Sequence, residues 1–182
     1  NLTALQISNR FNDVNRDGVF LVTGCSSGIG LECAKALVQK GTVVMACLPG
    51  PEAETARQLL TKISGNTPVH LFELDLGRKE SVEQCARAFL DLDFQLHALV
   101  LNAGINGAPT FGHFTPGEES TFAINFLGHF LLWQLLHPVL SRTPESRVVI
   151  TASESHRRVP TFSVDKDLPL QEKDHDPFHA YA

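Results

Sequence analysis

The chain has 182 residues, which is enough for one hydrophobic core and too few for two ordinary domains, and 43% of the residues are hydrophobic. The formal net charge is -5 and no run of lysine or arginine offers a track for a phosphate backbone, which argues against a nucleic-acid partner. We therefore expect a single globular domain over residues 1–182.

Four cysteines, Cys25, Cys33, Cys47 and Cys85, lie in apolar stretches of the sequence. Their spacing matches neither a paired CxxC metal site nor a disulfide scaffold, so we expect buried free thiols in a reducing compartment, the cytoplasm, and no metal. No charged segment followed by an apolar core opens the chain, so a secretory signal is not expected.

Short apolar runs rich in β-forming residues alternate with segments of helical periodicity. This alternation is typical of βαβ units, which build a parallel sheet in an α/β fold. The runs are almost continuously apolar, as expected when helices cover both faces of the sheet. Strands are predicted at residues 19–23, 42–47, 69–74, 98–102 and 147–151.

Helices are predicted between the strands because apolar residues recur there at spacings of three and four. The first two helices are expected to end at Gly41 and Gly65, since glycine is preferred just past a helix end, and the third is expected to begin near Ser81. The residues predicted to face the core are Ile29, Cys33 and Leu37 in the first helix, Ala56, Leu59, Leu60 and Ile63 in the second, and Val82, Cys85, Ala86, Phe89 and Leu90 in the third.

A fourth helix is predicted to open with a capping box formed by Thr115 and Glu118 and to run, buried, to Leu136. Residues 120–141 contain no Asp, Glu, Lys or Arg, and this length could suggest a membrane span. We favour a helix buried in protein instead, because six residues interrupt the apolar run by polarity or kinking. They are Asn125, Gly128, His129, Gln134, His137 and Pro138. Residues 159–178 have no periodicity and are expected to form a surface loop.

A glycine-rich segment, Thr-Gly-Cys-Ser-Ser-Gly-Ile-Gly, follows the first predicted strand and opens the first predicted helix. Glycines allow a tight turn and a close approach to a pyrophosphate, and the helix N-terminus offers unpaired N–H groups to the anion. No Lys follows the last glycine, which excludes a P-loop, and an accidental glycine-rich turn is the alternative. The segment predicts a Rossmann-type, doubly wound sheet with a dinucleotide held by Thr23, Gly24, Ser26, Ser27, Gly28, Ile29 and Gly30.

The same turn, together with Asn102, Ala103 and Gly104 after the fourth strand, resembles the fingerprint of the classical short-chain dehydrogenase/reductase family. The resemblance implies that Asn102 supports the central strands and that the Ala103 and Gly104 backbone lies against the cofactor. It also implies that Asp75, with Leu76 beside it, hydrogen-bonds the adenine. An aspartate at a helix N-terminus or in a turn is the alternative for Asp75.

Residues 122–130 resemble the family's helix that carries an active-site asparagine, here Asn125, which helps hold a water in the proton relay. A buried amide needs partners, and satisfaction by backbone alone is the alternative. Residues 147–156 resemble the region of the catalytic serine, which implies Ser153, with Ser155 as the fallback. These segments are similar to the retinol dehydrogenase-like and WW-domain-containing-oxidoreductase-like branch, and His156 is given no chemical role.

Tyr181 resembles the family's general acid/base, which is followed four residues later by a Lys that depresses its pKa. The sequence stops at Ala182 and begins without Met. We therefore expect a fragment, with the sheet incomplete at its C-terminal end, an exposed sheet edge and no activity as it stands. A non-catalytic nucleotide-binding module is the alternative, while a sugar-nucleotide epimerase or a methyltransferase fits the site residues less well.

The resemblance implies an oxidoreductase that moves a hydride between NAD(P)(H) and an alcohol or carbonyl of retinoid, steroid or lipid origin. NADP(H) is favoured by the branch, although residues 46–49 after the second strand contain neither the acid that reads NAD nor the Arg that reads NADP, and Leu48 stands in place of that Arg. A homodimer through residues 122–136 is a further expectation, from the apolar surface of that helix and the habit of the family.

Overall fold

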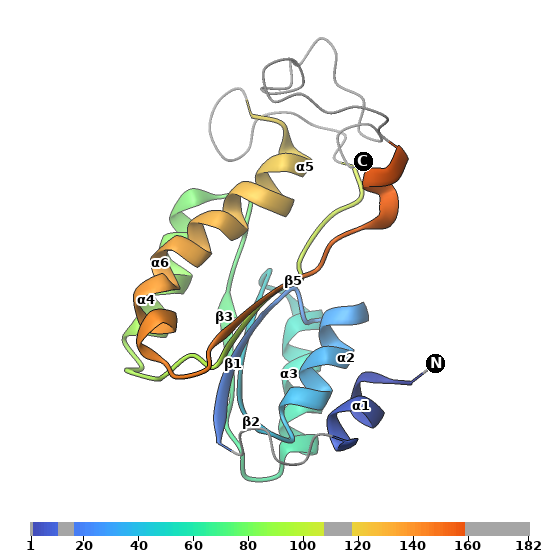
Figure 1. The fold of residues 1–182 in the computed structure, drawn as a ribbon, viewed down its shortest axis with the longest axis vertical. Helices are drawn as coiled ribbons and strands as arrows, with labels where there is room; N and C mark the ends of the chain where they lie inside the picture. The colour runs from blue at the N-terminus through green and yellow to red at the C-terminus, as the bar shows by residue number, and fades with distance from the viewer. Residues whose placement is uncertain (1, 11–16, 108–117, 159–182) are drawn as a thin grey trace.

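The computed structural model describes residues 2–10, 17–107 and 118–158. Its centre is a five-stranded parallel sheet with the strand order β3-β2-β1-β4-β5 (Figure 1). The order steps outward from β1 in both directions, which is the doubly wound Rossmann-type arrangement that the sequence predicts. All five predicted strands are confirmed, to within one residue at each end: β1 Gly18–Thr23, β2 Gly41–Cys47, β3 Val69–Glu73, β4 Ala98–Leu101 and β5 Arg147–Ile150.

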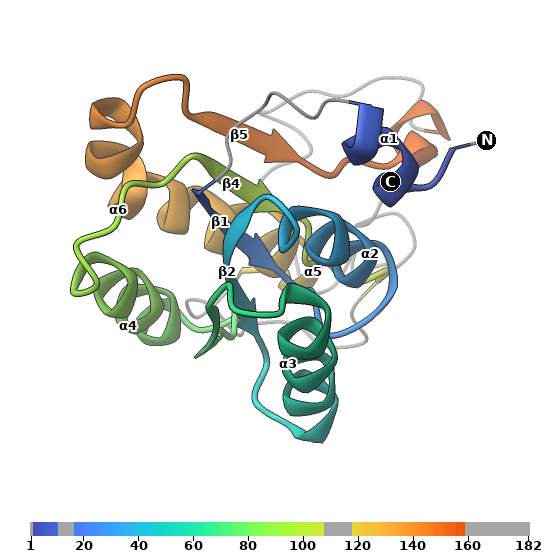
Figure 2. The ribbon, with the colours of Figure 1, turned by 90° about the horizontal axis from the view of Figure 1, so that it is seen from below.

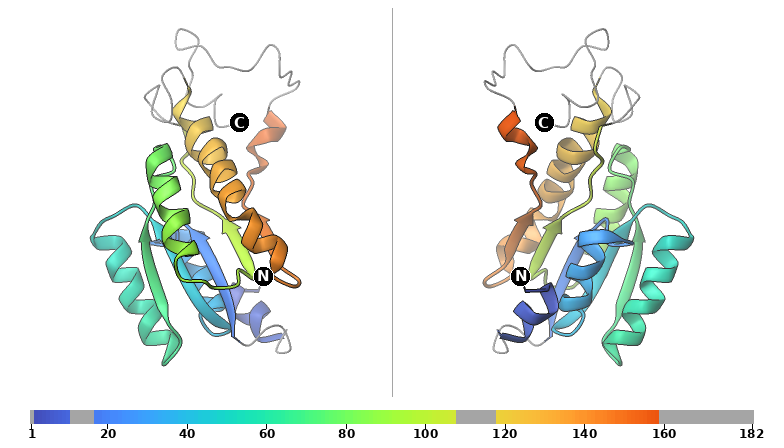
Figure 3. Two further views of the ribbon diagram at one scale, coloured as in Figure 1. Left: turned by 90° about the vertical axis from the view of Figure 1, so that its left-hand side faces the viewer. Right: turned by 90° about the vertical axis from the view of Figure 1, so that its right-hand side faces the viewer.

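Two hydrophobic clusters form, one on each face of the sheet, because successive strand residues point to opposite faces. Leu21 and its register partners Val44 and Leu99 face one cluster, whereas Val22 and its partner Met45 face the other. The helices divide in the same way: α4 and α6 cover the first face, and α2 and α3 cover the second (Figures 2 and 3). The core is therefore split between the two layers.

The first three predicted helices are present, but the core face predicted for each of them is partly wrong. They are α2 Gly28–Leu37, α3 Pro51–Ser64 and α4 Lys79–Leu90. Ile29 is 74% exposed, because α2 packs on the sheet through small residues, Gly30, Ala34 and Ala36. Leu59, Ile63 and Leu90 are likewise exposed, whereas the other predicted residues of α4 are buried. An additional helix, α1 Ala4–Arg10, packs against α2.

The fourth predicted helix is longer than expected and begins differently. It consists of α5 Ser120–Phe122, a π-helical segment η1 Ala123–Leu127, and α6 Gly128–Arg142. Its N-cap is Glu119, whose carboxylate accepts hydrogen bonds from the N–H groups of Thr121 and Phe122, so the predicted Thr115–Glu118 capping box is wrong. Glu118 precedes the helix, and Thr115 lies outside the described residues.

By length and composition, the helix over Ser120–Arg142 is the one candidate for a membrane span in the part of the chain that the structure describes. Its residues Leu132, Leu136 and Leu140 are buried in the cluster shared with α4. This packing is that of a helix that covers a sheet, as the sequence predicts.

Strand β5 does not have the buried character that its apolar sequence predicts. All four of its residues are exposed, and Ile150 is 70% exposed. The strand pairs with β4 on one side and lies at the end of the strand order. An exposed edge of this kind is the one expected from the sequence, and such an edge favours association with other chains.

Phe89 tests the layered core, since it is fully buried in the cluster between α4 and α6. Replacement of Phe89 by Ala removes a buried ring and should lower the free energy of unfolding by about 3–5 kcal/mol in chemical denaturation. Leu90→Ala is the matched control, since the neighbouring Leu90 is exposed and should cost about 0.5 kcal/mol. Equal losses from the two variants would contradict this assignment of the core face.

Candidate dinucleotide-binding and catalytic site

The predicted site residues that the structure describes gather at one edge of the sheet. Because the strands are parallel, their carboxyl ends all point to this edge. The turn from Thr23 follows β1, Asp75 follows β3, Asn102 follows β4, and Ser153 follows β5. Helix α5 and the short 3-10 helix η2 Glu154–Arg158 lie at the same end of the molecule (Figures 1 and 3).

The glycine-rich turn has the backbone conformation that its sequence predicts. Gly24 and Gly28 have φ angles of 63° and 55°, a region that favours glycine. Ser27 is the N-cap of α2, yet its side chain makes no capping hydrogen bond. A Cβ atom placed on Gly28 would have no neighbour within 4 Å. The helix N-terminus therefore faces open space, where its N–H groups can bind an anion.

Two glycines of the turn are required by close contacts with the loop after β4. A Cβ atom on Gly24 would lie 2.7 Å from the Cα and Cβ atoms of Ala103. A Cβ atom on Gly30 would lie 2.4 Å from the carbonyl oxygen of Gly24 and 2.5 Å from Nδ2 of Asn102. These contacts explain why the glycine-rich turn and the segment from Asn102 to Gly104 occur together in the sequence.

Asn102 joins the ends of three strands. Its Nδ2 group donates to the carbonyl oxygens of Thr23, the last residue of β1 (3.1 Å), and of Gly24, the next residue (3.2 Å). Its Oδ1 atom accepts a longer hydrogen bond from the hydroxyl of Thr151, beyond β5 (3.4 Å). This geometry matches the supporting role that the family resemblance implies.

Thr23 is fully buried at the end of β1, and its hydroxyl binds the loop after β4. The backbone N–H groups of Asn102 and Ala103 donate to its Oγ1 atom, at 2.9 and 3.0 Å. The Nε2 atom of His129 lies 2.9 Å from the same oxygen. Thr23 thus fixes the turn from its buried side, while Gly28 lies on its exposed side.

Asn125 lies in η1 and binds the loop after β4 through both ends of its amide. Its Oδ1 accepts from the N–H of Ile105 and its Nδ2 donates to the carbonyl of Ile105, each at 2.9 Å. A Cβ atom on Gly104 would lie 3.2 Å from Oδ1. The amide is therefore satisfied by backbone, which was the alternative to a relay role, and the relay role stays a prediction.

Ser153 follows β5 and is half-buried at the start of η2. Its Oγ atom accepts a hydrogen bond from the N–H of Ser155 (3.1 Å), and its carbonyl accepts one from Nδ1 of His156 (2.6 Å). These local bonds fix the backbone around Ser153. Tyr181, the predicted acid/base, lies outside the described residues.

Asp75 forms a turn of its own after β3. Its Oδ1 accepts from the N–H of Gly77 (2.9 Å), and its own N–H donates to the hydroxyl of Ser81 (2.9 Å). Leu76 is buried against α6, where a Cβ atom on Gly128 would lie 2.3 Å from the Leu76 carbonyl oxygen. The turn role of Asp75 is thus present, and its contact with adenine stays a prediction.

The cysteines are free thiols, as predicted, although Cys33 is only partly buried. Burial raises the pKa of Cys85 to about 12. The Sγ atoms of Cys25 and Cys47 lie 3.6 Å apart, and this hydrogen bond, together with burial, raises the pKa of Cys25. Among residues 2–10, 17–107 and 118–158, no group of three or more His, Cys, Asp or Glu side chains is placed to hold a metal ion.

Sequence reasoning gave no role at the site to two residues, His129 and Ile105. His129 is buried between Thr23 and Asn125, and a buried histidine four residues after a buried asparagine in an apolar helix was the available signal. Ile105 contributes only backbone atoms, which no side-chain pattern reveals.

The residues present fit a dinucleotide. A pyrophosphate needs close access to backbone N–H groups, and the turn offers this at Gly28, where a Cβ atom would have no neighbour within 4 Å, and at the uncapped start of α2. The turn itself contains no charged side chain, so the binding would depend on backbone dipoles.

Gly30 provides a test of this cradle. Gly30→Ala should lower the free energy of unfolding by about 1–3 kcal/mol, because its Cβ would overlap firmly held atoms of Gly24 and Asn102. It should also abolish NADPH binding measured by fluorescence titration. Gly65→Ala is the control: Gly65 also has a positive φ but no neighbour within 4 Å, so stability should fall while NADPH binding persists. Retained binding in Gly30→Ala would contradict the assignment.

Comparison with known proteins agrees with this site. The sequence profile of the short chain dehydrogenase family matches residues 18–164. The chain is 43% identical over 186 aligned residues to the short-chain dehydrogenase/reductase prx1 of Penicillium roqueforti, covering 99% of this chain and 53% of the relative. It is 41% identical over 140 residues to the WW domain-containing oxidoreductase of Gallus gallus, covering 76% of this chain and 34% of the relative.

Retinol dehydrogenase 11 of Mus musculus is 37% identical over 139 residues, covering 76% of this chain and 44% of that protein. Among solved structures, a short chain dehydrogenase from Shigella flexneri complexed with NADP superimposes with a TM-score of 0.68 at 27% identity, covering 80% of this chain and 63% of the other. The chain spans about half the length of the first of these relatives, and less of the others. Both the family and the branch expected from the motifs are confirmed: the chain belongs to the short-chain dehydrogenase family.

Proposed function

We propose that the protein transfers a hydride between a nicotinamide cofactor and a substrate that is interconverted between alcohol and carbonyl. The observation that carries the proposal is the convergence of the glycine-rich turn, Asn102 and Ser153 at one edge of the sheet. A bound nicotinamide would supply the carbon that gives or takes the hydride. The protein's residues would position the substrate oxygen and manage its proton.

Ser153 is proposed to bind the substrate oxygen. One lone pair of its Oγ atom accepts the N–H of Ser155, and the hydroxyl keeps its own hydrogen for donation to that oxygen. Such a donor stabilises negative charge that develops on the oxygen during transfer. Tyr181 is proposed to pass the proton, and Asn125 to support the relay, on the family resemblance.

The proposed cofactor is NADP(H). A structural relative, the Shigella flexneri enzyme, is complexed with NADP, which supports this choice. Leu48 is 64% exposed just after β2, where the family reads the adenosine ribose.

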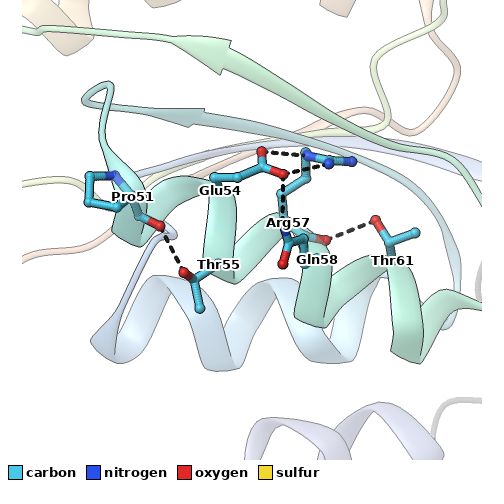
Figure 4. Close-up of polar contacts among 6 residues, drawn as sticks. All are labelled: Pro51, Glu54, Thr55, Arg57, Gln58 and Thr61. Carbon is cyan, nitrogen blue, oxygen red and sulfur yellow. Dashed lines mark hydrogen bonds and ion pairs between the residues drawn. The ribbon is translucent and has the colours of Figure 1, made fainter.

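The first arginine after β2 is Arg57 on α3, and two hydrogen bonds hold its guanidinium on Glu54, at 2.9 and 2.6 Å (Figure 4). Hydrogen bonds from Arg57 keep the pKa of Glu54 at about 2, so the pair stays charged at neutral pH.

The proposed substrate class is an alcohol or aldehyde with a large apolar body, such as a retinoid, a steroid or a lipid-derived aldehyde. Its support is the similarity to retinol dehydrogenase 11. A panel of retinal, a steroid ketone, a long-chain aldehyde and a short polar aldehyde, each assayed with NADPH, tests this class. Faster turnover of the short polar aldehyde than of the three apolar compounds would contradict it.

Ser153 and Ser155 give the sharpest test of the chemistry, using the protein expressed from its complete reading frame. Ser153→Ala should lower kcat by a factor on the order of 100 to 1,000, because a donor to the developing oxyanion is lost, while the Kd for NADPH is unchanged. Ser155→Ala is the matched control and should retain most of the activity. If the Ser155 variant loses activity instead, the catalytic serine has been assigned to the wrong position.

Leu48 tests where the adenosine end lies. Leu48→Arg adds a donor for the 2'-phosphate and should tighten NADPH binding by about threefold to tenfold, since an exposed charged hydrogen bond contributes on the order of 1 kcal/mol. NADH binding should not improve. Leu59→Arg places the same charge on an exposed position of α3 and should change neither affinity. Equal effects of both arginines would indicate general charge attraction rather than a specific contact.

A further inference from the structure

His129 connects two parts of the site that no other described side chain joins directly. The residue is buried in the first turn of α6. Its Nε2 atom lies 2.9 Å from the hydroxyl oxygen of Thr23, and its Nδ1 atom lies 3.1 Å from the carbonyl oxygen of Asn125. One imidazole ring thus spans from the start of the dinucleotide turn to η1.

The partners of the ring determine which nitrogen carries the hydrogen. The carbonyl oxygen of Asn125 can only accept, so Nδ1 of His129 must donate. A neutral imidazole has one N–H, and Nε2 is therefore an acceptor that takes the hydrogen of the Thr23 hydroxyl. The hydroxyl could turn instead to the carbonyl of Val100, but that distance is longer, 3.4 Å.

An imidazolium would not fit the same cluster. It would point a second N–H at Thr23 Oγ1, which already accepts the N–H groups of Asn102 and Ala103. Three donors would then compete for two lone pairs. Burial also lowers the pKa of His129, an effect that exceeds the opposing contribution of its hydrogen bond to Asn125. Both considerations favour the neutral ring.

The hydrogen bonds close a circuit through three chain segments. Thr23 binds the N–H of Ala103, the chain continues to Ile105, Ile105 binds the amide of Asn125, and His129 leads from Asn125 back to Thr23. The π-helical segment η1 carries one side of this circuit. The N–H of Gly128 bonds to the carbonyl of Ala123, five residues earlier, and the helix is locally widened there. Loss of Thr23 would leave Nε2 of the buried His129 without this partner, and loss of His129 would leave the buried Thr23 hydroxyl with only the longer contact to Val100.

We propose that His129 is a positioning residue, a neutral imidazole protonated on Nδ1 that holds η1 and Asn125 in register with the turn that binds the dinucleotide. The inference rests on the proposed function in one respect, that the turn binds NADP(H). The tautomer does not depend on that function, and the two can therefore fail separately.

The first experiment measures the tautomer in the wild-type chain. In nitrogen chemical shifts of 15N-histidine-labelled protein at neutral pH, the ring signal that His129→Phe removes should be that of an imidazole protonated on Nδ1 alone. A ring assigned to His129 that is protonated on Nε2, or on both nitrogens, would overturn the inference. The measurement needs no ligand.

The second experiment measures the Kd for NADPH by fluorescence titration. His129→Phe keeps a flat ring but loses both hydrogen bonds, His129→Gln keeps an acceptor toward Thr23, and His129→Asn keeps a donor toward Asn125. Because the circuit requires both bonds, all three variants should weaken NADPH binding by about threefold to tenfold. His137→Phe, the same change at an exposed position of α6, should leave the Kd unchanged.

The outcomes separate the two hypotheses. Wild-type affinity in folded His129→Phe would overturn the positioning role, even with the expected tautomer. Absence of NADPH binding by the wild-type chain would count against the proposed function and would leave the tautomer to stand or fall on the nitrogen shifts. In a double-mutant cycle on the Kd for NADPH, the effects of Thr23→Val and His129→Phe on the binding free energy should be non-additive, because each removes the same contact. Additive losses of binding free energy would overturn the link between the two residues.

Discussion

A hydroxyl group has one hydrogen and two lone pairs, and all three are engaged at Thr23. Its oxygen accepts two backbone N–H groups from the loop after β4, and its hydrogen is directed at His129. Because the residue is fully buried, each bond lost would leave a polar group without water to replace it. The turn after β1 is therefore fixed relative to the loop after β4. The glycines follow from this constraint, since the two backbones approach too closely for side chains at Gly24 and Gly30.

The dinucleotide turn and the side chains that support it are neutral groups rather than charged ones. The turn from Thr23 to Gly30 has no ionisable side chain other than a buried thiol, His129 is uncharged, and the basic residue that follows β2, Arg57, is engaged by Glu54. In the proposed function, recognition of a phosphate here would depend on oriented N–H groups at the start of α2. Such groups lose no rotamer entropy on binding, and they cannot be titrated away. Leu48 is consistent with this character, because it is an exposed apolar residue just after β2.

Much of the fold could be predicted from the sequence because parallel strands covered on both faces are nearly continuous apolar runs. The glycine positions and Asn102 were also predictable, since backbone conformation and close approach leave a distinct residue signature. Other features depend on tertiary contacts. Ile29 has the period of a buried residue, but α2 lies against the sheet through its small residues, and Ile29 is left on the side that faces away. The cap of α5 is Glu119 rather than the more usual Thr, which no rule of residue preference would have chosen.

The contact between Thr23 and Asn102 joins residues 79 positions apart in the chain. A loop of that length must close before either partner gains anything, which makes such contacts slow to form. During synthesis the glycine-rich turn leaves the ribosome well before Asn102 does, and β2 and β3 can pair before the turn has its partners. The amino-terminal half therefore leaves the ribosome before the complete dinucleotide turn exists. A bound dinucleotide can stabilise only those chains in which β4 has already joined β1.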